Sequence, residues 1–242
     1  MFHVKHSDAI DAQDLETALH AAGVQSTVAQ RSMLVSHAQS VLHTNRTTNL
    51  TRIVQPTAVI RLHILDSLAF LPFVSPLSGP LVDIGSGAGY PGVPIAVMTG
   101  LQVTLCEANR RKAAFLSSFV LDQGLPARVF HGRAEDLARA EPEIYSTALA
   151  RAVAGLPSLV ELAAPLLAMG GCFIALKGEP SPDEVSAGSA AGALCGMAQK
   201  QDTPYVLQGG NERRRVIVYE RVARPSVHLP RRVGMAQTKP LG

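Results

Sequence analysis

The chain has 242 residues and a formal net charge of +3, with 47% hydrophobic but only 5% aromatic residues. That length suits one well-cored α/β domain with an appendage. No window of 18 uncharged apolar residues and no secretory signal occur, so we expect neither a membrane span nor export. Cys106, Cys172 and Cys195 match no disulfide or metal spacing, which indicates a protein of the reducing cytoplasm without a metal centre.

Three helices are predicted before the first strand. Apolar residues recur at helical spacing over 9–22 and 27–43, and a third helix should span 56–71. The polar run 44–52 is either a connecting loop or a lip that meets a substrate, since binding residues concentrate on loops. We therefore expect residues 1–75 to form a helical cap ahead of the α/β domain.

A glycine-rich segment follows the first predicted strand. From Leu81 to Gly92 the sequence is LVDIGSGAGYPG, and its alternating glycines can take positive φ and let a ligand approach the main chain. A helix should follow, because Pro91 and Pro94 suit a first helical turn. Strand, glycine turn and helix together predict the nucleotide-binding corner of an open α/β sheet.

Two cofactors are candidates for this corner. Gly87, Gly89 and Gly92 spell the GxGxxG pattern of dinucleotide binding, and Glu107 lies 20 residues beyond Gly87 as a ribose-binding acid would. Asp83 favours another ligand, because a carboxylate at the strand end would repel a pyrophosphate. The same carboxylate suits the ammonium and sulfonium groups of S-adenosylmethionine (SAM). No lysine follows the glycines, which excludes a P-loop, so SAM is favoured and a dinucleotide is the alternative.

Strands and helices alternate beyond the glycine loop. Strands are predicted at 102–107, 127–131, 145–150, 172–178 and 215–220, and helices at 113–123, 156–167 and, more weakly, 181–196.

Several of these strands deliver polar groups to the ligand-binding edge. Glu107 ends the second strand, where its carboxylate can accept hydrogen bonds from an adenosine ribose. The loop 132–136 after the third strand offers backbone N–H groups to an adenine. Arg151 and Lys177 end the fourth and fifth strands, and for Arg151 we favour a cofactor or substrate contact over a structural ion pair.

The C-terminal part is strongly basic. From Arg213 onward, eight cationic residues stand against the single acid Glu220. This asymmetry indicates contact with a polyanion such as nucleic acid, and a solvated tail after Pro225 is the alternative.

Absent motifs narrow the chemistry further. No Asn-Pro-Pro-aromatic tetrapeptide occurs, which counts against methylation of an exocyclic base amine, and no cysteine follows a proline, which counts against covalent attack on a pyrimidine.

A set of motifs, in this order, resembles the RsmG (GidB) family of small-subunit ribosomal RNA guanine-N7 methyltransferases. The motifs are Asn49-Leu50-Thr51, His63 with Leu65-Asp66-Ser67-Leu68, Asp83 to Pro94, Arg133-Ala134-Glu135, Arg151-Ala152, Leu176-Lys177-Gly178 and Pro230-Arg231-Arg232-x-Gly234. The match covers roughly residues 40–180 and the tail, and Gly-Tyr-Pro-Gly-Val-Pro is its most specific part. Val233 and Ala236 stand where the tail pattern usually has prolines, and residues 181–212 match weakly.

The resemblance implies an α/β class I SAM-dependent methyltransferase fold with a Rossmann-like seven-stranded sheet whose last strand is reversed. We expect a helical cap at 1–75, a SAM-binding domain at 76–224 and a basic tail at 225–242. The implied activity is methylation of one guanine in 16S rRNA of the small ribosomal subunit, by a cytoplasmic monomer.

The resemblance also implies roles for individual residues. With the sequence arguments above, the cofactor-binding set is Asp83, Gly85, Gly87, Gly89, Tyr90, Glu107, Ala134, Glu135 and Arg151. The residues expected to face the RNA are Asn49, His63, Asp66, Lys177, Arg213, Arg231 and Arg232.

No catalytic base is expected, because guanine N7 has a free lone pair and can accept a methyl group without losing a proton. Three other functions are alternatives: a dinucleotide-dependent oxidoreductase, a ribosome-binding protein without activity, and a small-molecule methyltransferase.

Overall fold

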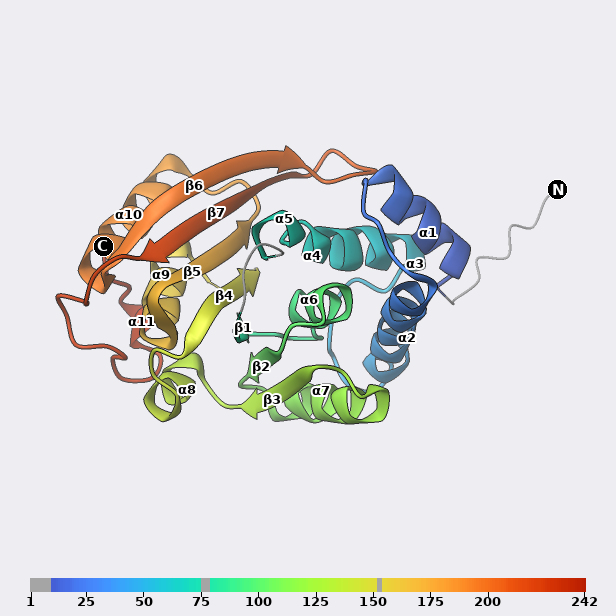
Figure 1. Ribbon diagram of the computed structural model, residues 1–242, viewed down its shortest axis with the longest axis horizontal. Helices are drawn as coiled ribbons and strands as arrows, with labels where there is room; N and C mark the ends of the chain where they lie inside the picture. Colours follow the sequence, from blue (N-terminus) through green and yellow to red (C-terminus); the bar gives the residue numbers. More distant parts are fainter. Residues whose placement is uncertain (1–9, 75–78, 152–153) are drawn as a thin grey trace.

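The computed structural model describes residues 10–74, 79–151 and 154–242, and its centre is a seven-stranded sheet in the order β3-β2-β1-β4-β5-β7-β6 (Figure 1). Strands β1 to β5 run parallel, whereas β7 lies between β5 and β6 and is antiparallel to both. The expected sheet with a reversed last strand is confirmed. Its strands are β1 (Leu81–Ile84), β2 (Val103–Glu107), β3 (Ala127–His131), β4 (Tyr145–Arg151), β5 (Leu167–Lys177), β6 (Met197–Val206) and β7 (Arg213–Arg221).

Helices cover both faces of this sheet. One face carries α6 (Gly92–Thr99) and α7 (Arg110–Gln123), and the other carries α8 (Ala134–Ala140), α9 (Leu156–Ala163) and α10 (Pro182–Cys195). Successive residues of a strand point to opposite faces, so Leu81 joins the core under α6 and α7 while Val82 joins the core under α9. This double burial explains why the central strands are apolar on both sides.

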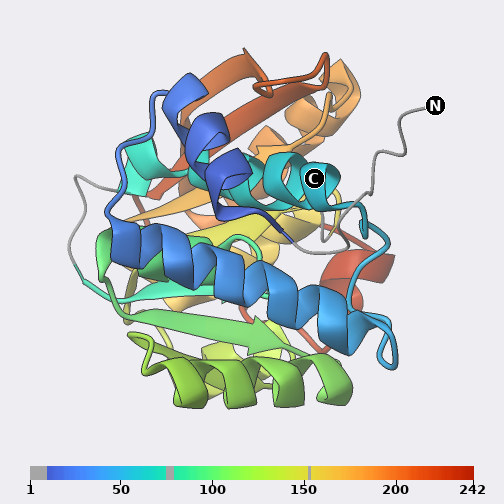
Figure 2. The same ribbon diagram turned by 90° about the vertical axis from the view of Figure 1, so that its right-hand side faces the viewer.

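Two capped helices precede the sheet. Asp11 caps α1 (Ala12–Ala21), and Thr27 and Gln30 form a reciprocal capping box at the start of α2 (Val28–Asn45). Both helices were predicted, although the expected first residue, Ala9, lies outside the described residues. Helix α2 packs on α6 and α7 (Figure 2), so the N-terminal helices share a core with the glycine loop.

The helix predicted over 56–71 forms, but it is irregular. It runs from Pro56 to Leu68 as α3 (Pro56–Val59), a π-helical segment η1 (Ile60–Leu65) and α4 (Asp66–Leu68), and α5 (Leu71–Val74) follows after a two-residue turn. The widened turn has a tertiary partner, because the Arg151 guanidinium donates to the carbonyls of Leu62 and His63 at 3.0 and 3.5 Å. By length and composition Pro56–Val74 could cross a membrane, but 56% of its 18-residue window is buried inside the fold, as in a core helix.

Two C-terminal elements differ from the prediction. Strand β6 was missed, because its sequence is polar, contains Pro204 and lies at the sheet edge with much of its length exposed. Strand β5 begins at Leu167, directly after the short 3-10 segment η2 (Ala164–Leu166), five residues before the predicted start at Cys172.

The loop predicted over 132–136 is shorter than expected, because residues 134 and 135 begin helix α8.

The C-terminal segment is not a free tail. It ends in α11 (Met235–Thr238), and Ala236 is buried at 2% exposure against the core under α9. Arg231 donates to both carboxylate oxygens of Glu161 at 2.6 Å. Residues 225–242 are therefore anchored to the core, although many of their side chains are exposed.

Candidate functional site

A hollow of about 340 Å³ opens at the carboxyl ends of β1, β2 and β4, where open α/β sheets bind their ligands. Four charged side chains converge on it, namely Glu107, Lys112, Arg133 and Arg151. A smaller hollow of about 50 Å³ adjoins it and shares Gly85, Ala108 and Arg133 with it. A larger, mainly apolar hollow of about 480 Å³ lies between the ends of α1, α5 and the β6–β7 turn, and none of the described residues that line it is charged. We take the first two as the candidate site.

The glycine loop forms the inner wall of the site. Gly85, Gly87 and Gly89 have φ of +74°, +60° and +99°, so each needs the left-handed region that other residues rarely adopt. At Gly89 an added Cβ would lie 2.8 Å from His37 Nε2. The loop is therefore held closely against α2 as well as being open to a ligand.

Asp83 supports the loop from behind. Its carboxylate is fully buried and accepts a hydrogen bond from Gly92 N–H at 3.0 Å. Burial raises the pKa of Asp83 to about 7. Its Oδ1 has no hydrogen-bond partner among the described residues, and Asp83 lines neither of the two hollows. A direct contact with a cofactor thus stays a prediction.

Glu107 occupies the position expected of a ribose-binding acid. One oxygen accepts from Gly87 N–H at 2.8 Å and the other accepts from Asn109 N–H at 2.6 Å. Each carboxylate oxygen can accept a further hydrogen bond. The carboxylate therefore joins the loops after β1 and β2, and both of its oxygens keep a lone pair for a ligand.

A stack of rings closes the side of the site next to the N-terminal helices. The rings of His63 and Tyr90 are stacked at 4.4 Å between centroids and 7° between planes. Tyr90 is 5% exposed, and its hydroxyl has no partner within the described ranges. His37 Nε2–H donates to the carbonyl of Ala88 at 2.9 Å, which fixes the glycine loop to α2.

Both histidines are held neutral. Burial lowers the pKa of His37 to about 4, and burial together with Arg151 lowers the pKa of His63 to about 3. Arg151 donates to His63 Nδ1 at 3.3 Å, so the ring proton is on Nε2, which donates to Thr51 Oγ1 at 2.8 Å. His63 is thus a fixed hydrogen-bond donor to the Thr51 side chain.

Arg151 makes the ion pair that we weighed as the alternative, and it also lines the hollow. Its guanidinium lies 3.1 Å from Asp66 Oδ2 and is 10% exposed. Asp66 also accepts from Arg214 at 3.1 Å and from the Tyr205 hydroxyl at 3.2 Å. A contact from Arg151 to a cofactor stays a prediction, but its position in the wall is fixed by Asp66.

Ala134 and Glu135 line the smaller hollow, together with Ile84 and Gly85. Glu135 is 7% exposed, and its Oε1 accepts a hydrogen bond from Gly234 N–H at 2.8 Å. Gln237 of α11 is part of the same wall. The C-terminal segment thus borders the position where an adenine is expected.

Comparison with known proteins identifies the family. The family model described as GidB, rRNA small subunit methyltransferase G, matches residues 30–216. The ribosomal RNA small subunit methyltransferase G of Chloroflexus aggregans is 40% identical over 197 residues, covering 80% of this chain and 82% of that protein. The protein of the same name from Desulfitobacterium hafniense is 35% identical over 210 residues, covering 85% and 87%.

The chain belongs to the rRNA small subunit methyltransferase G family.

Solved structures agree on the fold. Geranyl diphosphate methyltransferase in complex with GPP and sinefungin superposes with a TM-score of 0.55 at 16% identity, covering 67% of this chain and 79% of that one. TYW2 from M. jannaschii in complex with AdoMet gives 0.51 at 14% identity, covering 65% and 74%. At these identities the likeness shows the fold alone, and it confirms the class I methyltransferase fold.

Membership of an rRNA-modifying family makes the placement of the expected RNA-facing residues important. His63 and Asp66 are 7% and 4% exposed, and both are held in the contacts described above. Lys177 pairs with Glu184 at 2.8 Å and donates to the Ala154 carbonyl, also at 2.8 Å. Of the seven residues expected to face the RNA, three are exposed: Asn49, Arg213 and Arg232. RNA contact by these residues stays a prediction.

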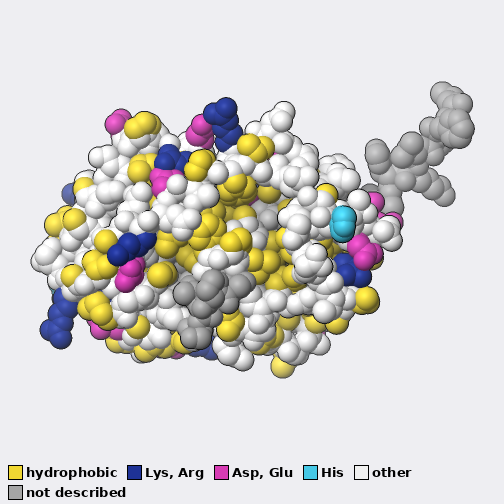
Figure 3. Space-filling view, turned by 45° about the horizontal axis from the view of Figure 1, so that its top comes forward, with side chains coloured by type: hydrophobic (Ala, Val, Ile, Leu, Met, Phe, Trp, Pro, Cys, Tyr) yellow, Lys and Arg dark blue, Asp and Glu magenta, His cyan; other side chains and the backbone are white. Residues whose placement is uncertain are grey.

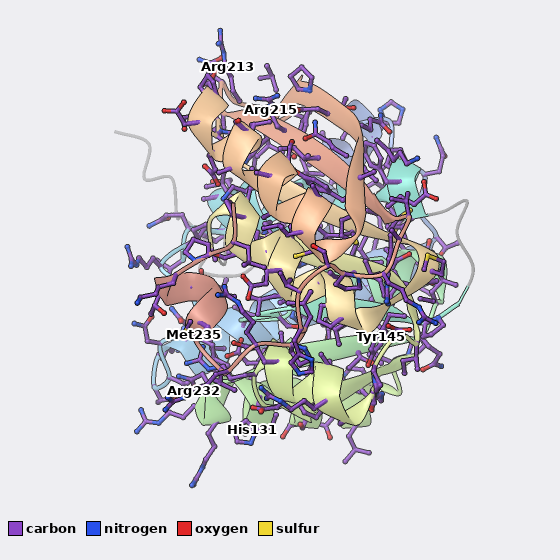
Figure 4. The ribbon with its side chains drawn as sticks, turned by 90° about the vertical axis from the view of Figure 1, so that its left-hand side faces the viewer. His131, Tyr145, Arg213, Arg215, Arg232 and Met235 are labelled. Atoms are coloured by element: carbon purple, nitrogen blue, oxygen red, sulfur yellow. The ribbon has the colours of Figure 1, made fainter. Side chains whose placement is uncertain are left out.

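The basic residues of the C-terminal part do not form one surface. Figure 4 shows Arg213 and Arg215 at the opposite end of the molecule from Arg232. Several pair with acids: Arg213 with Glu179, Arg214 with Asp66, Arg215 with Asp202, and Arg221 with Glu143. On the face shown in Figure 3, Lys and Arg side chains lie mostly beside Asp or Glu.

The structure adds residues that the sequence did not assign to the site. Lys112 and Arg133 line the main hollow, and Thr51 contacts His63 there. Arg133 lies two residues after the predicted third strand, and Lys112 lies in the first turn of α7, which follows the second strand, so both are near predicted strand ends. The role of His37 has no comparable signal, because it depends on α2 packing on the glycine loop.

Proposed function

We propose that the protein transfers a methyl group from SAM to N7 of one guanine in 16S rRNA of the small ribosomal subunit. Family membership supports the rRNA substrate. The observation that carries the cofactor assignment is the convergence of Glu107 and the glycine loop on one hollow at the strand ends.

The residues of the hollow fit an adenosine. The free lone pairs of the Glu107 carboxylate suit both ribose hydroxyls, and main-chain groups around Ala134 suit the adenine. Two of the structural neighbours are complexes with AdoMet or sinefungin, which supports the same cofactor class here.

The residues around the methionine end fit its charges. Tyr90 and Arg151 stand beside the loop, where Arg151 can meet a carboxylate. The carboxyl group of Asp83 lies behind the loop, and a nearby ammonium or sulfonium would favour its ionised form. Asp83 Oδ1 and the Tyr90 hydroxyl have no hydrogen-bond partner in the described part of the chain, and a ligand or a water could satisfy them.

For this reaction the protein would have to align guanine N7 with the SAM methyl group, and it would not have to transfer a proton. When bound, SAM supplies an activated methyl group, and guanine N7 can accept it without a proton leaving. His63 stays neutral and engaged with Thr51, and burial raises the pKa of Tyr90, so neither ring acts as a base near neutral pH. The fixed wall formed by Arg151, His63 and Tyr90 would hold the base in line, an effect of proximity and orientation.

Lys112 and Arg133 would contact RNA phosphates at the rim of the hollow. Such contacts position the RNA, and the choice of base would come from an unstacked guanine entering the hollow. We propose a cytoplasmic monomer acting on the small subunit.

Transfer of labelled methyl from SAM tests this function. Unmodified small subunits, naked 16S rRNA and protein without RNA should be compared, and the RNA hydrolysed to identify the labelled base. We expect label in RNA only, released as 7-methylguanine. Label on another base would contradict the N7 assignment, and tight binding of NAD instead of SAM would favour the oxidoreductase alternative.

A further inference from the structure

The smaller hollow has one wall that comes from far along the chain. Gly85, Ala108 and Ala134 belong to the loops after β1, β2 and β3, but Gln237 belongs to α11 at the C-terminal end. The two segments meet at this hollow, because Gly132, the residue after β3, and Gln237 both line it. The C-terminal segment thus lies across the strand ends at which the adenine is expected.

Three contacts hold the segment in this position. Arg231 donates to both oxygens of Glu161, whose side chain is only 3% exposed. Arg139 of α8 donates to the Arg231 carbonyl at 2.9 Å. Gly234 N–H donates to Glu135 at 2.8 Å, directly beside the hollow.

These contacts differ in kind from those of a loosely attached tail. A two-fold hydrogen bond between a guanidinium and a carboxylate fixes direction as well as distance. Glu161 is buried in α9, where an ionised carboxylate is costly unless it is paired and hydrogen-bonded, and Arg231 provides both. Contacts with the core therefore fix the position of the segment, and Gln237 lines the hollow as a result.

We propose that residues 231–238 form the outer wall of the adenine end of the cofactor site. Gln237 contacts the adenine, because its amide can both donate and accept hydrogen bonds as an adenine edge requires. Arg231 and Glu135 are positioning residues that hold this wall through Glu161 and Gly234. This inference rests on SAM being the cofactor.

Two pairs of variants test the wall by calorimetric titration with SAM. Arg231→Gln and Arg232→Gln remove the same charge from adjacent residues, but only Arg231 makes the Glu161 contact. Gln237→Ala and Gln123→Ala remove the same side chain from two exposed helical positions, and Gln123 ends α7 outside both hollows. Circular dichroism and the unfolding temperature show whether each variant is folded.

We expect the SAM dissociation constant to rise about tenfold in Arg231→Gln and about threefold to tenfold in Gln237→Ala. The two controls should stay within about twofold of wild type. In the wild type, SAM should slow amide hydrogen exchange across residues 231–238.

Unchanged affinity in both Arg231→Gln and Gln237→Ala, or unchanged exchange on SAM addition, would overturn the inference while leaving the proposed function intact. If Arg231→Gln fails to fold, Gln237→Ala and the exchange measurement still decide. A wild-type protein that does not bind SAM would overturn the cofactor assignment, and this inference with it.

Discussion

Glu107 is the residue whose contacts best explain how the site is organised. Its carboxylate accepts main-chain hydrogen bonds from the loops after both β1 and β2, so one side chain sets the distance between them. Because each oxygen keeps a free lone pair, the same group can bind a ribose without releasing the loops.

Replacing Glu107 should separate cofactor binding from RNA binding. We expect Glu107→Ala to weaken SAM binding about tenfold to a hundredfold, the scale of hydrogen bonds to a charged group, with RNA affinity nearly unchanged. Calorimetry with SAM and filter binding with 16S rRNA measure the two. Glu141→Ala, which breaks an ion pair at the far end of α8, is the control. Equal losses of both affinities would refute the division.

His37 makes stability depend on pH with a definite sign. Its folded-state pKa of about 4 lies below the ordinary 6.5, so the unfolded chain binds the proton more readily. The stabilisation is complete above pH 6.5 and is lost as the pH falls toward 4. The buried Asp83, with its pKa raised to about 7, has the opposite effect: its contribution to stability increases as the pH falls.

A His37→Gln variant should lack this contribution. Between pH 7.5 and pH 5 the wild type should lose about 2 kcal/mol more unfolding free energy than the variant, the amount given by the pKa difference. Urea unfolding at the two pH values measures both. Because Asp83 is present in both proteins, its effect cancels in the comparison. Parallel losses in the two proteins would show that His37 is protonated when folded.

At the scale of elements, α2 fixes the glycine loop. His37 bonds to the Ala88 carbonyl, and its ring lies 4.6 Å from that of Tyr90. The loop is thus preformed by a helix that precedes the sheet, so α2 contributes to the shape of the candidate site.

Two glycines test this locking of the loop. Gly89 and Gly124 both have positive φ, but an added Cβ would clash with His37 and Val93 at Gly89 and meet nothing within 4 Å at Gly124. We expect Gly89→Ala to cost about 3 kcal/mol of unfolding free energy, from strain and overlap, and Gly124→Ala about 1 kcal/mol from strain alone. Denaturant unfolding measures both. Similar small losses would mean that the loop can move away from α2.

Elements with a local signal were predicted, and those with a tertiary cause were not. The glycine loop, β1 to β4 and the first two helices follow from turn chemistry and periodicity. The π-helical turn at Ile60–Leu65 depends on Arg151, which lies far along the chain. Strand β6 is a polar edge strand, and nothing in its own pattern distinguishes it from a loop.

The same division holds for the site. The sequence placed Glu107, Arg151 and the glycines at the ligand edge, because the ends of parallel strands meet there. It did not place Asp66 under Arg151, or Gln237 beside Ala134, because both depend on packing between distant segments.

Across the whole molecule, the Lys and Arg side chains that the structure describes are distributed over several faces and do not form one basic patch. The C-terminal cations pair with acids at several places, whereas Lys112 and Arg133 stand at the rim of the hollow. RNA binding at the hollow should therefore depend on these two cations more than on the net charge.

Salt dependence measures their contribution. We expect Lys112→Gln and Arg133→Gln each to weaken RNA binding and to reduce the slope of log affinity against log salt by about 0.7 to 0.9, one phosphate contact each. Lys200→Gln at the β6 edge is the control, because its side chain pairs with Glu220 far from the hollow. A reduced slope in the control alone would place the RNA on another face.

A crystal structure with bound S-adenosylhomocysteine would locate the cofactor site. We expect the ligand in the two adjoining hollows at the strand ends, with its ribose hydroxyls within hydrogen-bond distance of Glu107 and its adenine between Ala134 and Gln237. Ligand bound instead in the larger apolar hollow beside α1 and the β6–β7 turn would contradict this expectation.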